Sequence, residues 1–251
     1  MKKLKTLNLI FLCLILDCAI SKFNTVLAQS SSLSIDNYDK LVNLSSPKIS
    51  PDGSKILLIS RKVDIEENKY FNTLWSIDIN KKNTTSLTHN RPYVSQPEWS
   101  PTGNYISFLA KGENNKQQIF KLSVNGGKAQ QVTHSTEGVM SYKWSPNGLL
   151  FAYTQKDQPL VKNNNKYNKS FEVGYDWYLA EESARPVHIW VCSSEGNNEN
   201  QLTKGESGFS NLLGNFEWSP DCKEIVFVQQ PKPHSSEFLN SSLQLINIET
   251  E

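Results

Sequence analysis

Short apolar runs separated by polar turn residues recur along this 251-residue chain. Each run follows a similar five-residue phrase, which consists of Ile or Trp, then Ser-Pro, a small polar residue, and Gly or Cys. In such a phrase Pro fixes φ at the second turn position, and Gly supplies a positive φ at the fourth. The pattern therefore predicts pairs of strands joined by a tight turn. The phrases occupy residues 49–53, 99–103, 144–148 and 218–222, and the runs occupy residues 56–59, 105–109, 149–153 and 225–228.

Two further segments complete each repeat. The first alternates apolar and polar positions, as a half-buried strand requires, and the second closes on Leu-Thr or Val-Thr. The alternating segments are 74–79, 119–124, 189–194 and 243–248, and the closing segments are 86–88, 131–133 and 201–203. The phrases begin 50, 45 and 74 residues apart. Four-stranded units repeated at this spacing predict the blades of a β-propeller.

We predict an all-β fold, namely a partial β-propeller of about three and a half four-stranded blades over residues 38–251. The fourth repeat is expected to be incomplete, because Glu251 comes directly after its third strand. Trp99, Trp144 and Trp218 are expected to wedge between blades. Open sheet edges favour pairing with other chains, so edge-mediated self-association is a possible interaction. The predicted blades cover about 46–88, 93–133, 139–203 and 214–251, and the third contains an insertion over 157–185.

The first 28 residues have the three-part layout of a secretory signal peptide. Lys2, Lys3 and Lys5 form a basic start, residues 7–16 are nearly all apolar, and Ala28 ends a plausible cleavage site. An apolar stretch of this length is too short to span a bilayer. We expect cleavage after Ala28 and export to the periplasm or the extracellular space, with no membrane attachment afterwards. An uncleaved anchor is the alternative.

Removal of this leader takes away four Lys and one Asp, so the net charge changes from +1 to −2. No basic stripe remains to bind a phosphate backbone, which disfavours nucleic acid as a partner. Two cysteines remain, Cys192 and Cys222, and an even number of cysteines in an exported protein is compatible with a disulfide. Cys192, however, falls on an apolar strand position, and Cys222 stands where the other phrases have Gly. Whether the two thiols pair is left open, because geometry decides it.

Catalytic motifs are not evident. A serine hydrolase needs a nucleophile on a strained elbow, a base and an orienting acid. The sequence contains no Gly-x-Ser-x-Gly, and the nearest segment, 205–208, is one residue short. Structural roles are expected for all four histidines, which are His89, His134, His188 and His234. No spacing typical of a metal or cofactor site occurs, so we predict no catalytic, metal-binding or cofactor-binding residue in this chain.

The insertion over 157–185 is the least repetitive part of the chain, and loops of this length are often functional. Its Asn/Lys-rich part, 162–169, is expected to be solvated, whereas 171–179 is rich in aromatic residues and is expected to be ordered. Glu181 and Glu182 are adjacent carboxylates beside this aromatic segment. They either point into a central cavity and hold a substrate amine, or lie solvated on a loop, which is the more common state of Glu.

The blade phrases and Leu-Thr endings resemble the N-terminal propeller of the prolyl oligopeptidase family. Phe-Glu-Val-Gly at 171–174 and Arg-Pro-Val-His-Ile-Trp at 185–190 are similar to acylaminoacyl-peptidase and dipeptidyl-peptidase-like exported members. The resemblance covers residues 38–251. It implies a propeller that restricts access of short peptides to a separate α/β-hydrolase domain, and no residue of that domain's Ser, Asp and His triad has a counterpart here.

The resemblance also bears on the paired carboxylates. Some dipeptidyl-peptidase members bind the peptide amine with a Glu pair in an Asp-Trp-x-Tyr-Glu-Glu stretch. Here residues 176–182 read Asp-Trp-Tyr-Leu-Ala-Glu-Glu, with one residue more between Trp and the pair. Glu181 and Glu182 are therefore candidate substrate-binding residues by resemblance, with a departure in spacing.

Three functional interpretations remain. The first is a substrate-gating propeller portion of an exported serine peptidase that hydrolyses short peptides, with catalysis supplied by a hydrolase domain outside this sequence. The second is a non-enzymatic, TolB-like periplasmic propeller that binds a protein or peptide partner. The third is a non-functional remnant that does not fold stably.

Overall fold

The computed structural model describes residues 40–88, 91, 93–159, 184–210 and 215–249. These residues lie in the second of two compact units, Asp39–Glu251, which is described here by itself. They form sixteen β-strands and a short 3₁₀ helix, η2 (Ser235–Asn240). Within these residues no helix is long and apolar enough to cross a membrane. The leader, residues 1–28, and most of the insertion lie outside the described residues.

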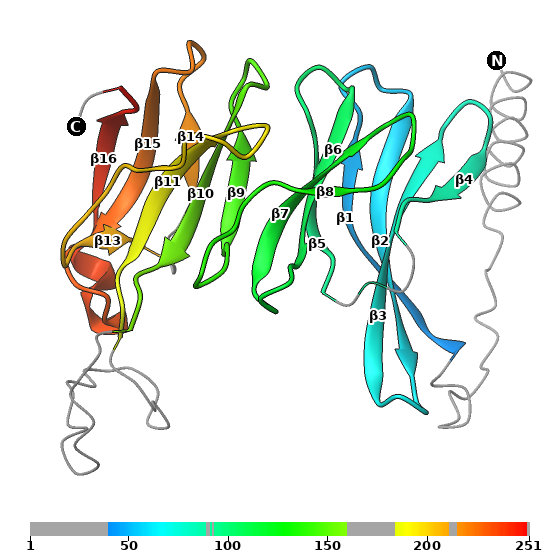
Figure 1. Cartoon of the computed structure of the whole chain (residues 1–251), viewed down its shortest axis with the longest axis horizontal. Coiled ribbons are helices and arrows are strands. Elements are labelled where there is room, and N and C mark those ends of the chain that lie inside the picture. Colours follow the sequence, from blue (N-terminus) through cyan, green and yellow to red (C-terminus); the bar gives the residue numbers. More distant parts are fainter. Residues whose placement is uncertain (1–39, 89–90, 92, 160–183, 211–214, 250–251) are drawn as a thin grey trace, which may run out of the picture. The chain divides into compact units, whose positions relative to one another are not determined.

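The strands form four antiparallel sheets that follow one another along the chain (Figure 1). In sheets one to three, each strand pairs with the strand before it. Sheet one contains β1 (Val42–Ile49), β2 (Lys55–Asp64), β3 (Lys69–Asp78) and β4 (Asn83–Ser86). Sheet two contains β5 (Ser95–Trp99), β6 (Tyr105–Lys111), β7 (Gln117–Ser123) and β8 (Gln130–Gln131). Sheet three contains β9 (Ser141–Trp144), β10 (Leu150–Lys156), β11 (Val187–Ser193) and β12 (Asn200–Gln201).

Sheet four differs in its strand order. It contains β13 (Gly208–Phe209), β14 (Phe216–Trp218), β15 (Glu224–Gln230) and β16 (Ser242–Asn247). β13 and β14 both pair with one edge of β15, and β16 pairs with the other edge. Because β13 and β14 share one edge of β15, sheet four is three strands wide among the described residues, whereas sheets one to three are four strands wide. The predicted fold class, an all-β partial propeller of repeated four-stranded sheets, is confirmed.

The recurring turn phrase has the same hydrogen bond in all four sheets. The hydroxyl of its Ser accepts a bond from the backbone N–H five residues later, at 2.9–3.0 Å. The last residue of each phrase has a positive φ, between 63° and 73°. Cys222 is the one that is not Gly, so it adopts a backbone conformation that most side chains avoid. The predicted turn chemistry therefore explains why the phrase recurs. The serines that accept this bond are Ser50, Ser100, Ser145 and Ser219.

The Leu-Thr and Val-Thr endings fasten the fourth strand of each complete sheet to the third. The Thr hydroxyl accepts the backbone N–H of a buried strand-three residue at 2.9–3.0 Å, in the pairs Leu74–Thr88, Ile119–Thr133 and Ile189–Thr203. The preceding residue also donates its backbone N–H to the same strand. These short strands are consequently held by a side chain as well as by backbone pairing.

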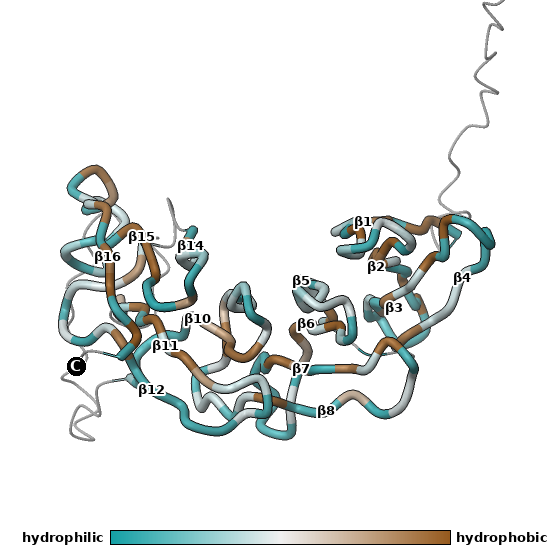
Figure 2. The backbone as a smooth tube through the Cα atoms, turned by 90° about the horizontal axis from the view of Figure 1, so that it is seen from above, coloured by the Kyte–Doolittle hydropathy of each residue, from teal (hydrophilic) through white to brown (hydrophobic). Residues whose placement is uncertain are grey.

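Neighbouring sheets pack through apolar side chains on their facing surfaces. Three buried clusters lie between sheets one and two, two and three, and three and four. In Figure 2 apolar segments coincide with central strands such as β7, β11 and β15. The expected position of the tryptophans between sheets is confirmed: Trp99 donates its indole N–H to Lys48 O of sheet one, and Trp144 donates to Ser107 Oγ of sheet two. Trp218 belongs to the cluster between sheets three and four.

Candidate functional site

The two ends of the insertion are tied together where they leave sheet three. The guanidinium of Arg185 donates from Nη1 to the backbone oxygen of Asp157 at 2.6 Å. The N–H of Asp157 donates to the oxygen of Pro186 at 3.0 Å. These bonds hold the two ends of the insertion together at the junction of β10 and β11. We call this pair of ends the stem.

The same guanidinium anchors the stem to the connection between sheets two and three. Arg185 Nη1 lies 2.7 Å from Glu137 Oε2, and each of the two side chains is only 15% exposed. An ion pair shielded from water to this extent is screened less than a surface pair. Arg185 therefore joins both ends of the insertion and the preceding sheet connection through one side chain.

His188 resembles a catalytic base at first sight. It is buried, its Nδ1 lies 3.1 Å from the Thr203 hydroxyl, and its Nε2 lies 3.3 Å from Asp157 Oδ2. Thr203, however, is the strand-fastening Thr described above, and its hydroxyl already accepts the N–H of Ile189. In sheet two Gln118 occupies the position of His188, and its Oε1 accepts a bond from the matching Thr133 hydroxyl at 2.9 Å.

The contact between His188 and Thr203 is therefore a variant of the structural contact between Gln118 and Thr133, with Asp157 beside it. By analogy with Gln118, His188 Nδ1 is placed to accept the Thr203 hydroxyl, and Nε2 faces Asp157. The 3.3 Å approach is not aligned as a hydrogen bond. A hydroxyl this deeply buried cannot meet a substrate, so we assign no catalytic role to the group.

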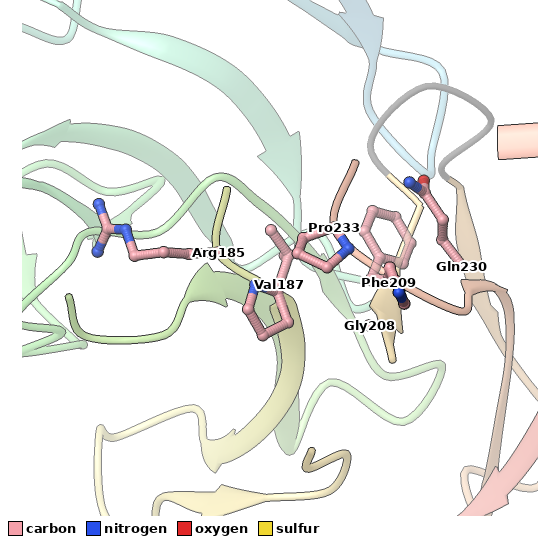
Figure 3. A pocket seen from close by; sticks show the side chains of 8 residues that line it. Arg185, Val187, Gly208, Phe209, Gln230 and Pro233 are labelled. Atoms are coloured by element: carbon pink, nitrogen blue, oxygen red, sulfur yellow. The ribbon is translucent and has the colours of Figure 1, made fainter. Parts of the chain in front are cut away.

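A small niche lies beside the stem, between β11, β13 and the connection from β15 to η2 (Figure 3). Its volume is about 20 Å³, which is room for about one water molecule and far too little for a peptide. A Cβ on Gly208 would lie 2.6 Å from the oxygen of Val187, so glycine is needed for this close approach. In Figure 3 the Arg185 guanidinium points away from Phe209 and Gln230. The niche itself is not a substrate site.

The candidate substrate-binding residues, Glu181 and Glu182, lie outside the described residues, so their role stays a prediction. His89 also lies outside them, whereas His134 is exposed and His234 is mostly buried. Over the described ranges no cluster of three or more His, Cys, Asp or Glu side chains is arranged to hold a metal.

Cys192 and Cys222 are both buried and both free. Cys192 pairs with Phe151 across the strands and faces the cluster between sheets two and three, as its apolar strand position predicted. Burial, followed by the nearby charge of Glu199, raises the pKa of the Cys192 thiol to about 12. A thiol in this state is a poor nucleophile.

Three comparisons place these features among known proteins. A family model described as the TolB beta propeller domain matches residues 29–174. The peptidase YuxL of Bacillus subtilis, described as uncharacterized, is 27% identical over 97 residues, which are 39% of this chain and 15% of that protein.

Among solved structures, an acylaminoacyl peptidase of Pyrococcus horikoshii has a TM-score of 0.58 at 19% identity, covering 76% of this chain and 28% of that one. TolB of Acinetobacter baumannii has a TM-score of 0.52 at 16% identity, covering 83% and 42%. The chain thus spans less than half the length of each of these proteins. The predicted resemblance to peptidase propellers is confirmed as a likeness in sequence to one peptidase and in fold to another.

Proposed function

This chain belongs to the TolB β-propeller domain family, and we propose that it is the substrate-gating propeller of an exported serine peptidase that hydrolyses short peptides. In this proposal a hydrolase domain outside the sequence supplies the Ser, Asp and His of the reaction. The propeller admits short peptides and excludes folded proteins. The observation that carries the proposal is the sequence similarity to a peptidase, 27% over 97 residues.

The stem of the insertion supports a binding role for the loop that it carries. Arg185 fixes the two ends of the loop to each other and to Glu137. A loop with a fixed base loses less conformational entropy when it closes on a ligand, which favours affinity. Within that loop we propose that the carboxylates of Glu181 and Glu182 bind the amine of a peptide.

Peptide binding by the purified chain tests this role. A dye-labelled tripeptide with a free amine is titrated against the wild type and against a Glu181→Gln, Glu182→Gln double variant. We expect the Kd to rise about tenfold in the variant, because charge-assisted hydrogen bonds to the amine are lost. The matched control is Glu113→Gln, an exposed glutamate in the connection between β6 and β7. An N-acetylated tripeptide should bind the wild type and the double variant equally weakly.

Equal binding of the free and acetylated peptides by the wild type would contradict the role of the carboxylates. The second candidate is a non-enzymatic, TolB-like periplasmic propeller that binds a protein or peptide partner, and a lack of any peptide binding would favour its protein-binding form. The match to the TolB propeller family model and the fold shared with TolB support this alternative. The reading frame beyond Glu251 discriminates further: a Gly-x-Ser-x-Gly elbow followed by Asp and His supports the peptidase, and further blades then a stop support the binder.

Export forms a separate part of the proposal and rests on the leader, residues 1–28. We expect N-terminal sequencing of the protein recovered from the periplasm or medium to begin at Gln29. A chain that keeps Met1 and sediments with membranes would support an uncleaved anchor instead.

A further inference from the structure

The sequence contains two Asn-Gly dipeptides, and both lie in tight turns. The first, at residues 125–126, lies in the connection between β7 and β8, and the second, at residues 147–148, ends the turn phrase of sheet three. In each turn the Asn is the third of four residues, and the N–H of the Gly donates to the backbone oxygen of the first. This bond measures 3.0 Å to Ser123 and 2.8 Å to Ser145. Both Asn residues are exposed, so the two turns form a matched pair.

An Asn followed by Gly can lose ammonia by a reaction within the chain. The backbone nitrogen of the Gly gives its proton to a base in the solvent and bonds to the amide carbon of the Asn side chain, and the bond from that carbon to the amide nitrogen breaks. Water then opens the resulting cyclic imide and leaves either Asp or isoaspartate, in which the backbone runs through the former side chain. Gly favours ring closure because it has no side chain to obstruct the approach.

The side chain of Asn147 is held away from this reaction. Its Oδ1 accepts hydrogen bonds from the Ser145 hydroxyl at 2.7 Å and from the N–H of Leu149 at 3.0 Å. The residue that follows Asn147 is packed as well, because a Cβ on Gly148 would lie 3.6 Å from Pro101 Cδ of sheet two. Ring closure at this site must turn the side chain and break both of its hydrogen bonds. The fold therefore opposes the reaction at Asn147.

The side chain of Asn125 is not restrained in this way. Its amide makes no hydrogen bond within the described part of the chain, and only its backbone N–H is engaged, with Ser123 Oγ at 3.2 Å. The two residues that follow stand in open space, because a Cβ on Gly126 or Gly127 would meet no atom within 4 Å. Ring closure here breaks only the turn bond of the Gly, which the other site has too. The amide of Asn125 is therefore free to turn toward the backbone nitrogen of Gly126.

We propose that Asn125 is a site of spontaneous modification, at which the folded protein is converted to Asp and isoaspartate, while the fold protects Asn147 from the same reaction. The reacting group is the side-chain amide of the chain itself, and water is the co-reactant. The change adds one negative charge to the β7–β8 connection. Sheet two should keep its fold afterwards, because the Thr133 hydroxyl holds the end of β8 to Ile119. This proposal does not depend on the peptidase function.

Comparison of the two sites in one sample tests the proposal. The purified chain is incubated at mildly alkaline pH, either folded or in guanidinium chloride, and then digested at acidic pH for mass spectrometry, which detects the replacement of an amide by an acid. In denaturant the two sites should react at similar rates, because both are Asn-Gly. In the folded protein Asn125 should react at least about tenfold faster than Asn147, since two further hydrogen bonds must break at Asn147. Equal rates at the two sites of the folded protein, or a folded protein in which Asn125 does not react, would overturn the proposal.

Two variants assign the charge change to one residue. Isoelectric focusing follows the acidic form that accumulates during the incubation. Asn125→Gln changes an exposed side chain and should abolish most of this form, because ring closure from the longer Gln side chain is slower. The matched control is Asn147→Asp, which places at this turn position the residue that the first and fourth phrases already have, and should leave the rate of accumulation unchanged. Equal accumulation in Asn125→Gln and in the wild type would contradict the assignment to Asn125.

Discussion

At the scale of single residues, the tryptophans between sheets differ in the hydrogen bonding of their indole N–H groups. Trp144 donates its indole N–H to Ser107 Oγ at 2.7 Å, but the buried indole N–H of Trp218 has no hydrogen-bond partner among the described residues. Ala152 stands in sheet three where Ser107 stands in sheet two, eight residues after the tryptophan of its own sheet. A hydroxyl on residue 152 would therefore supply the acceptor that the indole N–H of Trp218 lacks.

We predict that Ala152→Ser raises the free energy of unfolding by about 1 kcal/mol, because the new hydroxyl accepts the Trp218 N–H. Urea denaturation followed by tryptophan fluorescence measures the change. The matched control is Ala110→Ser, at another fully buried alanine with no unpartnered indole assigned to it. That control should lower stability by about 1–3 kcal/mol, since a buried hydroxyl without a partner is costly. Equal destabilisation by both changes would show that Trp218 is satisfied in another way.

The first turn phrase predicts a dependence of stability on pH. Hydrogen bonds from the Ser50 hydroxyl and from the N–H and hydroxyl of Ser54 hold the pKa of the Asp52 carboxyl at about 2, below its usual 3.8. A lowered folded-state pKa stabilises the fold fully above about pH 4, and this contribution is lost as the pH falls toward 2. Asp52→Asn removes it, and Asn is already present at the same position of the third phrase, as Asn147.

We therefore expect the difference in Tm between the wild type and Asp52→Asn to be greatest above pH 4 and to shrink toward pH 2. Thermal melts between pH 2 and pH 6 measure this difference. A gap that is constant over the whole range would mean that the variant acts through turn geometry and not through the carboxylate charge.

The buried cysteines give a chemical prediction. With the pKa of Cys192 raised to about 12, only about one thiol in ten thousand is ionised at pH 8. We expect no reaction of Cys192 with Ellman's reagent in the folded protein. In denaturant, a chain beginning at residue 29 should release two thiols, from Cys192 and Cys222, since both are free. Release of no thiol would indicate a disulfide between them.

At the scale of secondary-structure elements, the fourth strands are too short to be held by backbone pairing alone. β8 contains only Gln130 and Gln131, and the Thr133 hydroxyl adds bonds to Ile119 N at 3.0 Å and to Gln118 Oε1 at 2.9 Å. Thr133→Val keeps the shape and removes both bonds. We predict a loss of about 1–3 kcal/mol in the free energy of unfolding, because buried polar groups lose their partner. Thr133→Ser keeps the hydroxyl and should lose less.

The sequence was most informative where structure is determined by neighbouring residues. The turn phrase, the alternating third strands and the positive φ at Cys222 all follow from local chemistry, and each lies where the pattern predicted. The β2–β3 hairpin, by contrast, continues to Asp64 and starts again at Lys69, beyond the apolar residues that marked it. Backbone pairing extends these strands through exposed polar residues, and such pairing leaves little hydrophobic signal.

The stem of the insertion could not be predicted in the same way. Glu137 and Arg185 are 48 residues apart in the sequence and meet only because sheets two and three pack together. The contact between His188 and Thr203 was equally hidden, although its repeat equivalents, Gln118 and Thr133, are visible once the sheets are aligned. The residues before the four turn phrases are Lys48, Glu98, Lys143 and Glu217. The ion pairs Lys48–Glu98 and Lys143–Glu217 could not be predicted from this alternation, because they form between adjacent sheets.

At the scale of the whole molecule, limited proteolysis tests whether the chain folds as one packed series. Trypsin should cut first in the Lys-rich segment 162–169, which lies within the insertion, while Lys121, only 5% exposed and paired with Glu195, should resist. The insertion interrupts sheet three between β10 and β11, and these strands pair over seven residues from Leu150–Ser193 to Lys156–Val187. Both fragments also contribute to the apolar cluster between sheets two and three.

The two fragments produced by such a cut should therefore remain associated. We expect the nicked protein to elute from gel filtration at the position of the intact chain, with unchanged far-UV circular dichroism, and to separate only in denaturant. Each fragment alone would carry only half of sheet three, and its apolar side chains would be exposed to water. A small sheet that is uncovered in this way does not stay folded. Cleavage throughout the chain at similar rates would instead support the interpretation of a remnant that does not fold stably. Fragments that separate under native conditions would show that the packing between sheets is too weak to carry the fold.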